Sequence, residues 1–230
     1  SFIYCLSSVF QGVFSKSAWW KKARTSRRAG AYTKASERKE AVGMPIRIFI
    51  DQGHNPQGVN AGAEGFGLRE QDVNYAVGME LARLLNSDPR FVARVSRTTP
   101  TESLGASNAA SLQRRVQMAN SWPADYFVSI HCNANTNPAV NGTEVYVYQQ
   151  RTQAYWLAQH VLNGVVEAVG TKDNGVRLNP SLYVLRRTAM PAILVELAYL
   201  TNGNDALKLR DEQPAFARGI YNGILSYFGF

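Results

Sequence analysis

From residue 44 onward, short apolar runs alternate with longer stretches in which apolar residues recur every three or four positions. The short runs predict β-strands, and they cover 46–50, 91–96, 125–130, 143–148 and 192–197. The longer stretches predict helices, and they cover 71–86, 108–120, 152–169 and 214–228. Nearly continuous apolar strands separated by helices are typical of a mostly parallel, twisted sheet with helices on both faces. We therefore expect a single three-layer α/β domain over residues 44–230.

Residues 1–43 differ from the rest of the chain in charge. They contain nine lysines and arginines against two glutamates, which is +7 of the net charge of +8. A nucleic-acid-binding domain needs basic charge and nearby aromatic side chains on its folded surface. Because the remainder of the chain is almost neutral, the sequence argues against nucleic acid as a partner.

The same segment opens with 14 mostly apolar residues that serine and glutamine interrupt. A helix needs about 20 apolar residues to span a bilayer, and the basic residues follow the apolar stretch, which is the wrong order for a signal peptide. We interpret residues 1–43 as a basic tail or leader outside the fold. Trp19 and Trp20, next to the basic cluster, leave contact with a membrane surface open for this segment alone.

The composition narrows the protein class without indicating a function. The chain has 230 residues, 45% of them hydrophobic, and only 2 cysteines, which excludes disordered, collagen-like and disulfide-scaffold proteins. A chain of this length buries enough apolar surface to fold without a structural metal. Any metal ion would therefore serve chemistry.

Candidate chemistry lies at the ends of the predicted strands. The first strand leads into Asp51 and His54, another ends at His131, and the last contains Glu196. In open α/β sheets, ligands bind beyond the carboxyl ends of the strands, so we expect both histidines at one edge. The third histidine, His160, falls within a helical pattern, and we expect it on the surface.

Two glutamates complete the candidate set. Glu196 stands among apolar residues, where an ionised carboxylate must be paired or placed for a purpose. Glu70 opens a predicted helix, where it could simply compensate the helix dipole. Two imidazoles and one carboxylate are a ligand set of catalytic zinc, and a second carboxylate could transfer protons. The residues alone also fit ordinary buried histidines, and they do not say which glutamate would be the ligand.

Cysteine chemistry is not expected. Cys132 follows His131 directly, and neighbouring residues of a strand point to opposite faces, which argues against a cysteine–histidine dyad. Cys5 and Cys132 are too far apart in the sequence for a zinc-ribbon pair.

Five short motifs occur in one order along the chain. They are Asp51-Gln52-Gly53-His54, Glu70-Gln71-Asp72-Val73-Asn74, Ser129-Ile130-His131-Cys132-Asn133-Ala134, Gly142-Thr143-Glu144-Val145-Tyr146-Val147-Tyr148, and Pro191-Ala192-Ile193-Leu194-Val195-Glu196 with Thr201-Asn202 after it. In order and local sequence, residues 46–228 closely resemble the zinc-dependent N-acetylmuramoyl-L-alanine amidases of the amidase type 3 family.

The resemblance implies a site and a reaction. His54, Glu70 and His131 would bind one Zn²⁺, and Glu196 would be the catalytic carboxylate. The bond cut would be the amide between the lactyl group of N-acetylmuramic acid and the L-alanine of the peptidoglycan stem peptide. Glu144 and Asn133 would contact the substrate or support the ligands.

The resemblance also implies a setting. Residues 44–230 would form a bare catalytic domain, a monomer with peptidoglycan as its partner, acting in the cell envelope or outside the cell. Autolysins, sporulation enzymes and phage endolysins are enzymes of this kind.

Two other functions stay open at this point. A zinc carboxypeptidase, or another metallopeptidase acting on wall peptides, would also use two histidines and a glutamate, although its first two ligands typically lie a few residues apart. A non-catalytic wall-binding module with the same fold would be expected to lack Glu196 or a ligand, and this chain has all four residues.

Overall fold

The computed structural model describes residues 43–230. The predicted basic tail, except for Gly43, lies outside the described residues. Within the described part of the chain, none of the helices has the length and hydropathy needed to cross a bilayer.

A six-stranded sheet forms the centre of the described domain, in the order β4-β1-β5-β8-β6-β7. Its strands are β1 (Ile46–Gln52), β4 (Phe91–Val95), β5 (Tyr126–Asn133), β6 (Thr143–Val147), β7 (Asp173–Leu178) and β8 (Ala192–Tyr199). β4, β1, β5 and β8 pair in parallel. β6 pairs antiparallel with β8 and parallel with β7. The prediction of a mostly parallel sheet is confirmed, and β6 and β7 run against the other four strands.

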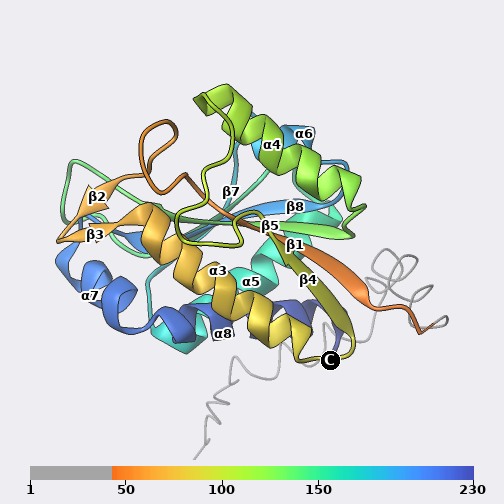
Figure 1. Cartoon of the computed structure of the whole chain (residues 1–230). Coiled ribbons are helices and arrows are strands. Elements are labelled where there is room, and N and C mark those ends of the chain that lie inside the picture. Colours follow the sequence, from red (N-terminus) through yellow and green to blue (C-terminus); the bar gives the residue numbers. More distant parts are fainter. Residues whose placement is uncertain (1–42) are drawn as a thin grey trace, which may run out of the picture.

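Helices cover both faces of this sheet (Figure 1). They are α3 (Glu70–Asn86), α4 (Asn108–Ser121), α5 (Gln153–Val169), α6 (Tyr183–Arg187), α7 (Gly203–Asp211) and α8 (Gln213–Phe228). α4 and α6 lie on one face, whereas α3, α5 and α8 lie on the other. This arrangement confirms the expected three layers.

Each interface between helices and sheet has its own apolar core. The larger core joins α3, α5 and α8 to side chains such as Ile50, Val128 and Val195. The smaller one joins α4 and α6 to Phe49, Phe127 and Leu194. Alternate residues of the same strands enter the two cores, as a strand covered on both faces requires.

The sequence pattern missed the elements with weak periodicity. They are β7, the five-residue α6, the polar α7 and a two-stranded hairpin of β2 (Glu64–Gly65) and β3 (Leu68–Arg69). β7 lies at the edge of the sheet, and its residues are exposed or only partly buried. Such a strand carries no clear alternation of apolar and polar residues.

Three glycines allow α5 and α8 to pack at very short range. A Cβ atom on Gly223 would lie 2.5 Å from the Cα of Val161, and one on Gly164 would lie 2.3 Å from the carbonyl oxygen of Gly219. Both distances are shorter than real Cβ contacts, and the neighbouring atoms are backbone. The glycines therefore determine how closely the two helices approach.

Gly223→Ala should destabilise the fold even though alanine is the better helix former. Alanine gains about 1 kcal/mol over glycine in a helix, whereas overpacking a tight contact costs about 1–3 kcal/mol. We expect urea titration to show a net loss of unfolding free energy. Gly203→Ala is the matched control, because its added methyl group would meet only Phe66 at 3.7 Å. Equal stability of the two variants would contradict this account of the helix contact.

Candidate metal centre and active site

Strand register aligns three of the predicted site residues. His131 of β5 pairs laterally with Glu196 of β8, and Glu196 pairs with Glu144 of β6. Laterally paired residues point to the same face and lie about 5 Å apart. The three side chains therefore form a row on the face that also carries α4 and α6.

His54 joins this row from the loop after β1. Its backbone is left-handed, with φ of 70°, which is uncommon for a residue other than glycine and is often found at functional sites. The preceding residue must be small, since a Cβ on Gly53 would lie 2.3 Å from Cε1 of His131. Gly53 thus lets the β1 loop pass directly against the His131 ring.

Glu70 brings the two imidazoles together. Its Oε1 atom lies 3.0 Å from Nε2 of His54 and 2.9 Å from Nδ1 of His131. Its Oε2 atom accepts a hydrogen bond from the Ala63 backbone at 3.0 Å, and the backbone N–H of Cys132 donates to Oε1 at 3.2 Å. Burial by itself raises the pKa of Glu70, but the hydrogen bonds from His131 and His54 outweigh it and hold this pKa well below its ordinary value.

His54, Glu70 and His131 fit a metal ion. Each offers one ligand atom, and these atoms all lie within 4.8 Å of one another. Nδ1 of His54 lies 3.1 Å from the carbonyl oxygen of Asn60. A proton on Nδ1 directed at that carbonyl leaves the lone pair on Nε2, the atom that faces Glu70, which is how metal-binding histidines are commonly oriented. Three such ligands with a free position are typical of catalytic sites.

Glu196 differs from Glu70 in having an unsatisfied oxygen. Its Oε2 atom is buried and has no hydrogen-bond partner within residues 43–230. Burial raises the pKa of Glu196 well above its ordinary value, and the carboxylates of Glu70 and Glu144 raise it further. A buried carboxyl oxygen without a partner is costly, so its position beside the cluster points to a functional role.

Glu144, in contrast, is fully engaged. Tyr146 donates a hydrogen bond to its Oε2 atom at 2.9 Å, and Tyr199 and Asn133 donate to its Oε1 atom. Arg177 of β7 adds an ion pair, with 2.6 Å between Nε and Oε2. Asn133 therefore contacts Glu144 and supports the row from the side.

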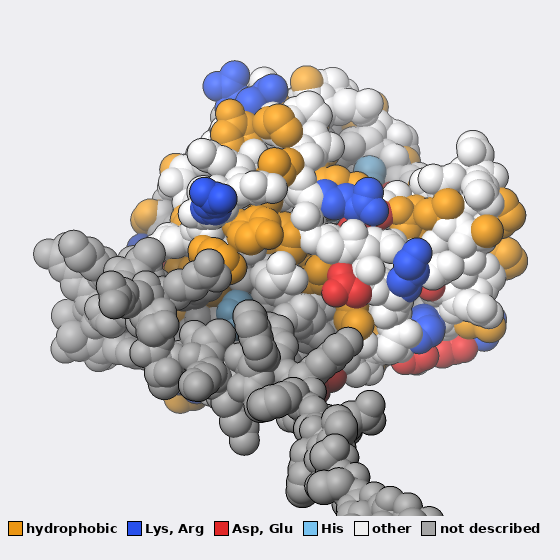
Figure 2. Space-filling model, turned by 180° about the vertical axis from the view of Figure 1, so that it is seen from behind, with side chains coloured by type: hydrophobic (Ala, Val, Ile, Leu, Met, Phe, Trp, Pro, Cys, Tyr) orange, Lys and Arg blue, Asp and Glu red, His pale blue; other side chains and the backbone are white. Residues whose placement is uncertain are grey.

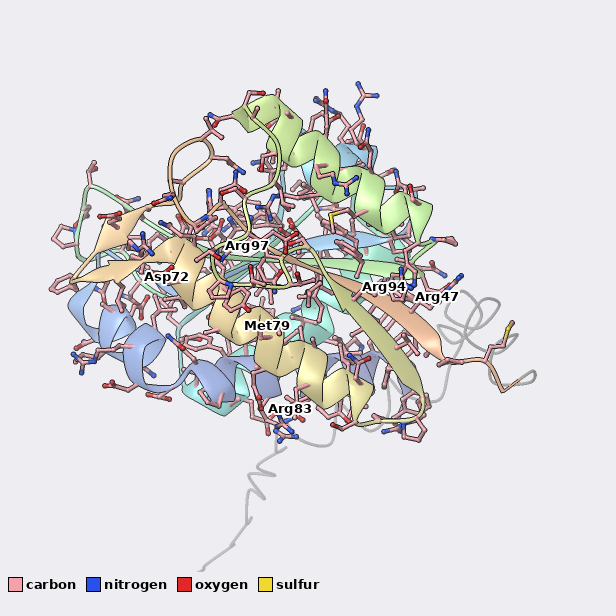
Figure 3. The ribbon with its side chains drawn as sticks, viewed as in Figure 1. Arg47, Asp72, Met79, Arg83, Arg94 and Arg97 are labelled. Carbon is pink, nitrogen blue, oxygen red and sulfur yellow. The ribbon has the colours of Figure 1, made fainter. Side chains whose placement is uncertain are left out.

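Two buried arginines donate hydrogen bonds to the backbone of the loop that carries His54. Nη2 of Arg115 donates to the carbonyl oxygen of His54 at 2.6 Å, and Nη1 of Arg97 donates to the same oxygen at 3.1 Å. Arg115 also pairs with buried Asp51 at 2.6 Å. Burial raises the pKa of Asp51, but the charge and hydrogen bond of Arg115 outweigh it and lower this pKa overall. Arg97, labelled in Figure 3, is fully buried, and its Nη1 atom also donates to the carbonyl oxygen of Gln71.

The main site residues predicted from the sequence come together in the structure, but some of the residues that support them were not predicted. His54, Glu70, His131 and Glu196 come together, and Glu144 and Asn133 lie beside them. Arg97, Tyr199 and Arg177 were not predicted. Arg97 directly follows a predicted strand, and that position is the one signal that would have identified it.

The remaining histidine and cysteine lie outside this chemistry. His160 is only partly exposed, because its Nδ1 atom lies 3.0 Å from the hydroxyl of Ser226 on α8. The expectation of a surface residue was therefore only partly right. Cys132 is buried on the opposite face from His131, with its sulfur 3.4 Å from Oδ1 of Asn74, and burial raises the pKa of its thiol well above the ordinary value. The prediction that no cysteine–histidine dyad forms is confirmed.

On the face shown in Figure 2, basic, acidic and histidine side chains meet within one small area. Opposite charges therefore gather on this side of the molecule instead of forming one extended basic surface.

The chain is similar to a known group of enzymes. Residues 48–226 match the family model described as N-acetylmuramoyl-L-alanine amidase. N-acetylmuramoyl-L-alanine amidase LytC of Bacillus subtilis (strain 168) is 36% identical over 185 residues, which cover 79% of this chain and 35% of LytC. N-acetylmuramoyl-L-alanine amidase CwlM of Bacillus licheniformis is 35% identical over 188 residues, covering 80% of this chain and 69% of CwlM. The chain thus spans about a third of the length of LytC.

Solved structures agree with these relatives. The crystal structure of N-acetylmuramoyl-L-alanine amidase from Clostridium difficile 630 superposes with a TM-score of 0.71 at 34% identity, covering 80% of this chain and 97% of the other. N-acetylmuramoyl-L-alanine amidase AmiC2 of Nostoc punctiforme superposes with a TM-score of 0.69 at 36% identity, covering 80% and 98%.

The buried Asp51–Arg115 pair yields a stability prediction. Arg115→Met leaves the Asp51 carboxylate buried without its cation, which costs about 3–5 kcal/mol of unfolding free energy. Urea titration at neutral pH measures the loss. Arg83→Met is the control, since the Arg83 side chain is largely exposed and pairs with Glu80 on the surface, and we expect little change there. A similarly small loss for Arg115→Met would mean that Asp51 is compensated by other groups.

Proposed function

The chain belongs to the N-acetylmuramoyl-L-alanine amidase family, and we propose that residues 44–230 form its catalytic domain and hydrolyse the lactyl–L-alanine amide of peptidoglycan with one zinc ion. The observation that carries this proposal is the joining of His54, Glu70 and His131 in one cluster with Glu196 in register beside it. The match of residues 48–226 to the family supports it.

We assign the zinc ligands to Nε2 of His54, Nδ1 of His131 and the carboxylate of Glu70. These are the atoms that already face one another. Zinc in such a site acts as a Lewis acid on a carbonyl oxygen and lowers the pKa of a bound water towards about 7. The contact of His54 with Asn60 fixes its ring, and the two arginines on the His54 carbonyl fix its backbone.

Glu196 is the group that moves protons. A carboxyl group with a raised pKa holds a proton more readily than an exposed one, which suits a residue that must accept a proton and then release it. Glu196 would take a proton from the attacking water and deliver it to the nitrogen of the departing L-alanine. Within residues 43–230, its Oε2 atom has no hydrogen-bond partner that competes for this proton.

We propose that the protein acts at the cell wall. Relatives named as a cell wall amidase and as a sporulation-specific amidase and an endolysin of Bacillus phage SPP1 support peptidoglycan as the partner. We propose that the domain acts as a monomer in the cell envelope or outside the cell. The clustering of all four residues favours catalysis over a wall-binding role.

The reaction is tested by mass analysis of digested peptidoglycan. We expect free stem peptides with an L-alanine amino terminus from the zinc-loaded protein. Glu196→Gln keeps the size of the side chain but removes its basicity, so we expect a rate loss of about 10²–10⁴-fold with one equivalent of zinc retained. Loss of zinc in this variant would instead make Glu196 a ligand, and peptides cut at other bonds would contradict the amidase assignment.

The metal site is tested by metal analysis of His131→Ala. Removing one of three ligands should reduce bound zinc well below one equivalent after dialysis against a weak chelator. His160→Ala is the matched control, because His160 lies on α5 and contacts α8, and it should keep full stoichiometry. Unchanged zinc in His131→Ala would remove the proposed ligand set.

A further inference from the structure

The guanidinium of Arg177 lies near the candidate active site and is only partly engaged by other protein groups. Its Nε atom is 2.6 Å from Oε2 of Glu144, while its side chain remains 51% exposed and that of Glu144 is 1% exposed. The contact is an ion pair, and no hydrogen bond of this guanidinium is found within residues 43–230. The guanidinium is thus anchored by the charge of a buried acid, while its N–H donors remain available.

The carboxylate that pairs with Arg177 is itself fixed in place. Glu144 is fixed by hydrogen bonds from Tyr146, Tyr199 and Asn133, and Tyr146 also pairs laterally with Arg177 across the two strands. A guanidinium oriented in this way loses less freedom on binding a ligand than a mobile surface arginine.

The surroundings favour an anionic group. Arginine binds carboxylates through two parallel hydrogen bonds. Arg186 and Arg187 of α6, which packs on the same face of the sheet, add further positive charge.

The spacing matches the second residue of a stem peptide. Glu144 pairs laterally with Glu196, about 5 Å away, and the guanidinium of Arg177 lies beside the Glu144 carboxylate. The guanidinium therefore stands roughly 5–10 Å from the catalytic carboxylate. Two extended residues span about 7 Å, so a carboxylate carried by the second residue beyond the scissile amide is within reach of Arg177.

We propose that Arg177, held by Glu144, binds a free carboxylate on the second residue of the stem peptide and so determines which stem peptides are cut. This inference rests on the proposed amidase function. It names Arg177 as a substrate-binding residue and Glu144 as a positioning residue that acts through it.

The test compares two synthetic substrates with the zinc-loaded protein of residues 1–230. Both are N-acetylmuramoyl tripeptides, and they differ only in whether the α-carboxyl group of the second residue, a γ-linked D-glutamate, is free or amidated. We expect the wild type to favour the free carboxylate by about 10- to 100-fold in kcat/KM, the usual effect of a hydrogen bond to a charged group, mainly through KM. In Arg177→Gln this ratio should fall towards one.

Two further variants make the comparison specific. Arg177→Lys keeps a cation beside Glu144, so that the buried acid is not left unpaired, but it lacks the bidentate fork and should show an intermediate ratio. Arg83→Gln is the control. Arg83 lies towards the far end of α3 from Glu70 (Figure 3), about 20 Å along the helix, and the wild-type ratio should be kept.

The outcomes separate the two hypotheses. A wild type that cleaves both substrates equally well, or Arg177 variants that lose both activities in proportion, would overturn the role of Arg177 and leave the amidase function standing. A wild type that cleaves the lactyl–alanine amide of neither substrate would overturn the proposed function, and the inference with it.

Discussion

The lateral register of β5, β8 and β6 is the constraint on which the rest of the site depends. It places His131, Glu196 and Glu144 side by side on one face of the sheet. A slip of one residue would turn every side chain of a strand to the other face. The apolar residues that precede them, such as Phe127 and Ile193, are buried in the two cores and hold this register. Packing in the interior thus determines the geometry at the edge.

Several charged side chains are buried around this row, and removing them from water costs free energy. Asp51, Glu70, Glu144, Arg97 and Arg115 are all buried, and each would destabilise the fold if it lacked a partner. Within the described domain, Arg115 pairs with Asp51, the two imidazoles with Glu70, and Arg177 with Glu144. Arg97 donates to backbone carbonyls through its Nη atoms, although its buried Nε atom has no partner there. Among the buried carboxylate oxygens of this domain, the Oε2 atom of Glu196 is the one without a partner. This contrast connects the energetics with the chemistry, because the least satisfied carboxyl group is the one proposed to move protons.

Much of the fold and of the central site could be predicted from the sequence. The apolar runs identified β1, β4, β5, β6 and β8, and helical periodicity identified the four longest helices. The strand-end pattern identified His54, His131 and Glu196, because a parallel sheet brings the carboxyl ends of its strands to one edge, and Glu70 was identified at the start of a predicted helix. The roles of the two glutamates came from the family resemblance, since residue type alone left them interchangeable. β7 and α6 were missed because an exposed edge strand and a five-residue helix have too little periodicity.

The sequence by itself determined the layers, the order of the main strands and helices along the chain, and which polar residues stand where apolar strands end, because these follow from local patterns of burial. Only the tertiary structure decided that β6 runs antiparallel to β8, which brings Glu144 beside Glu196. It also decided the register shift after His131 that pairs Asn133 with Tyr199 and lets both reach Glu144. The attachment of Arg177 to Glu144 depends on the same arrangement. Strand direction, register shifts and ion pairs between distant segments result from long-range packing, which no local pattern of apolar and polar residues encodes.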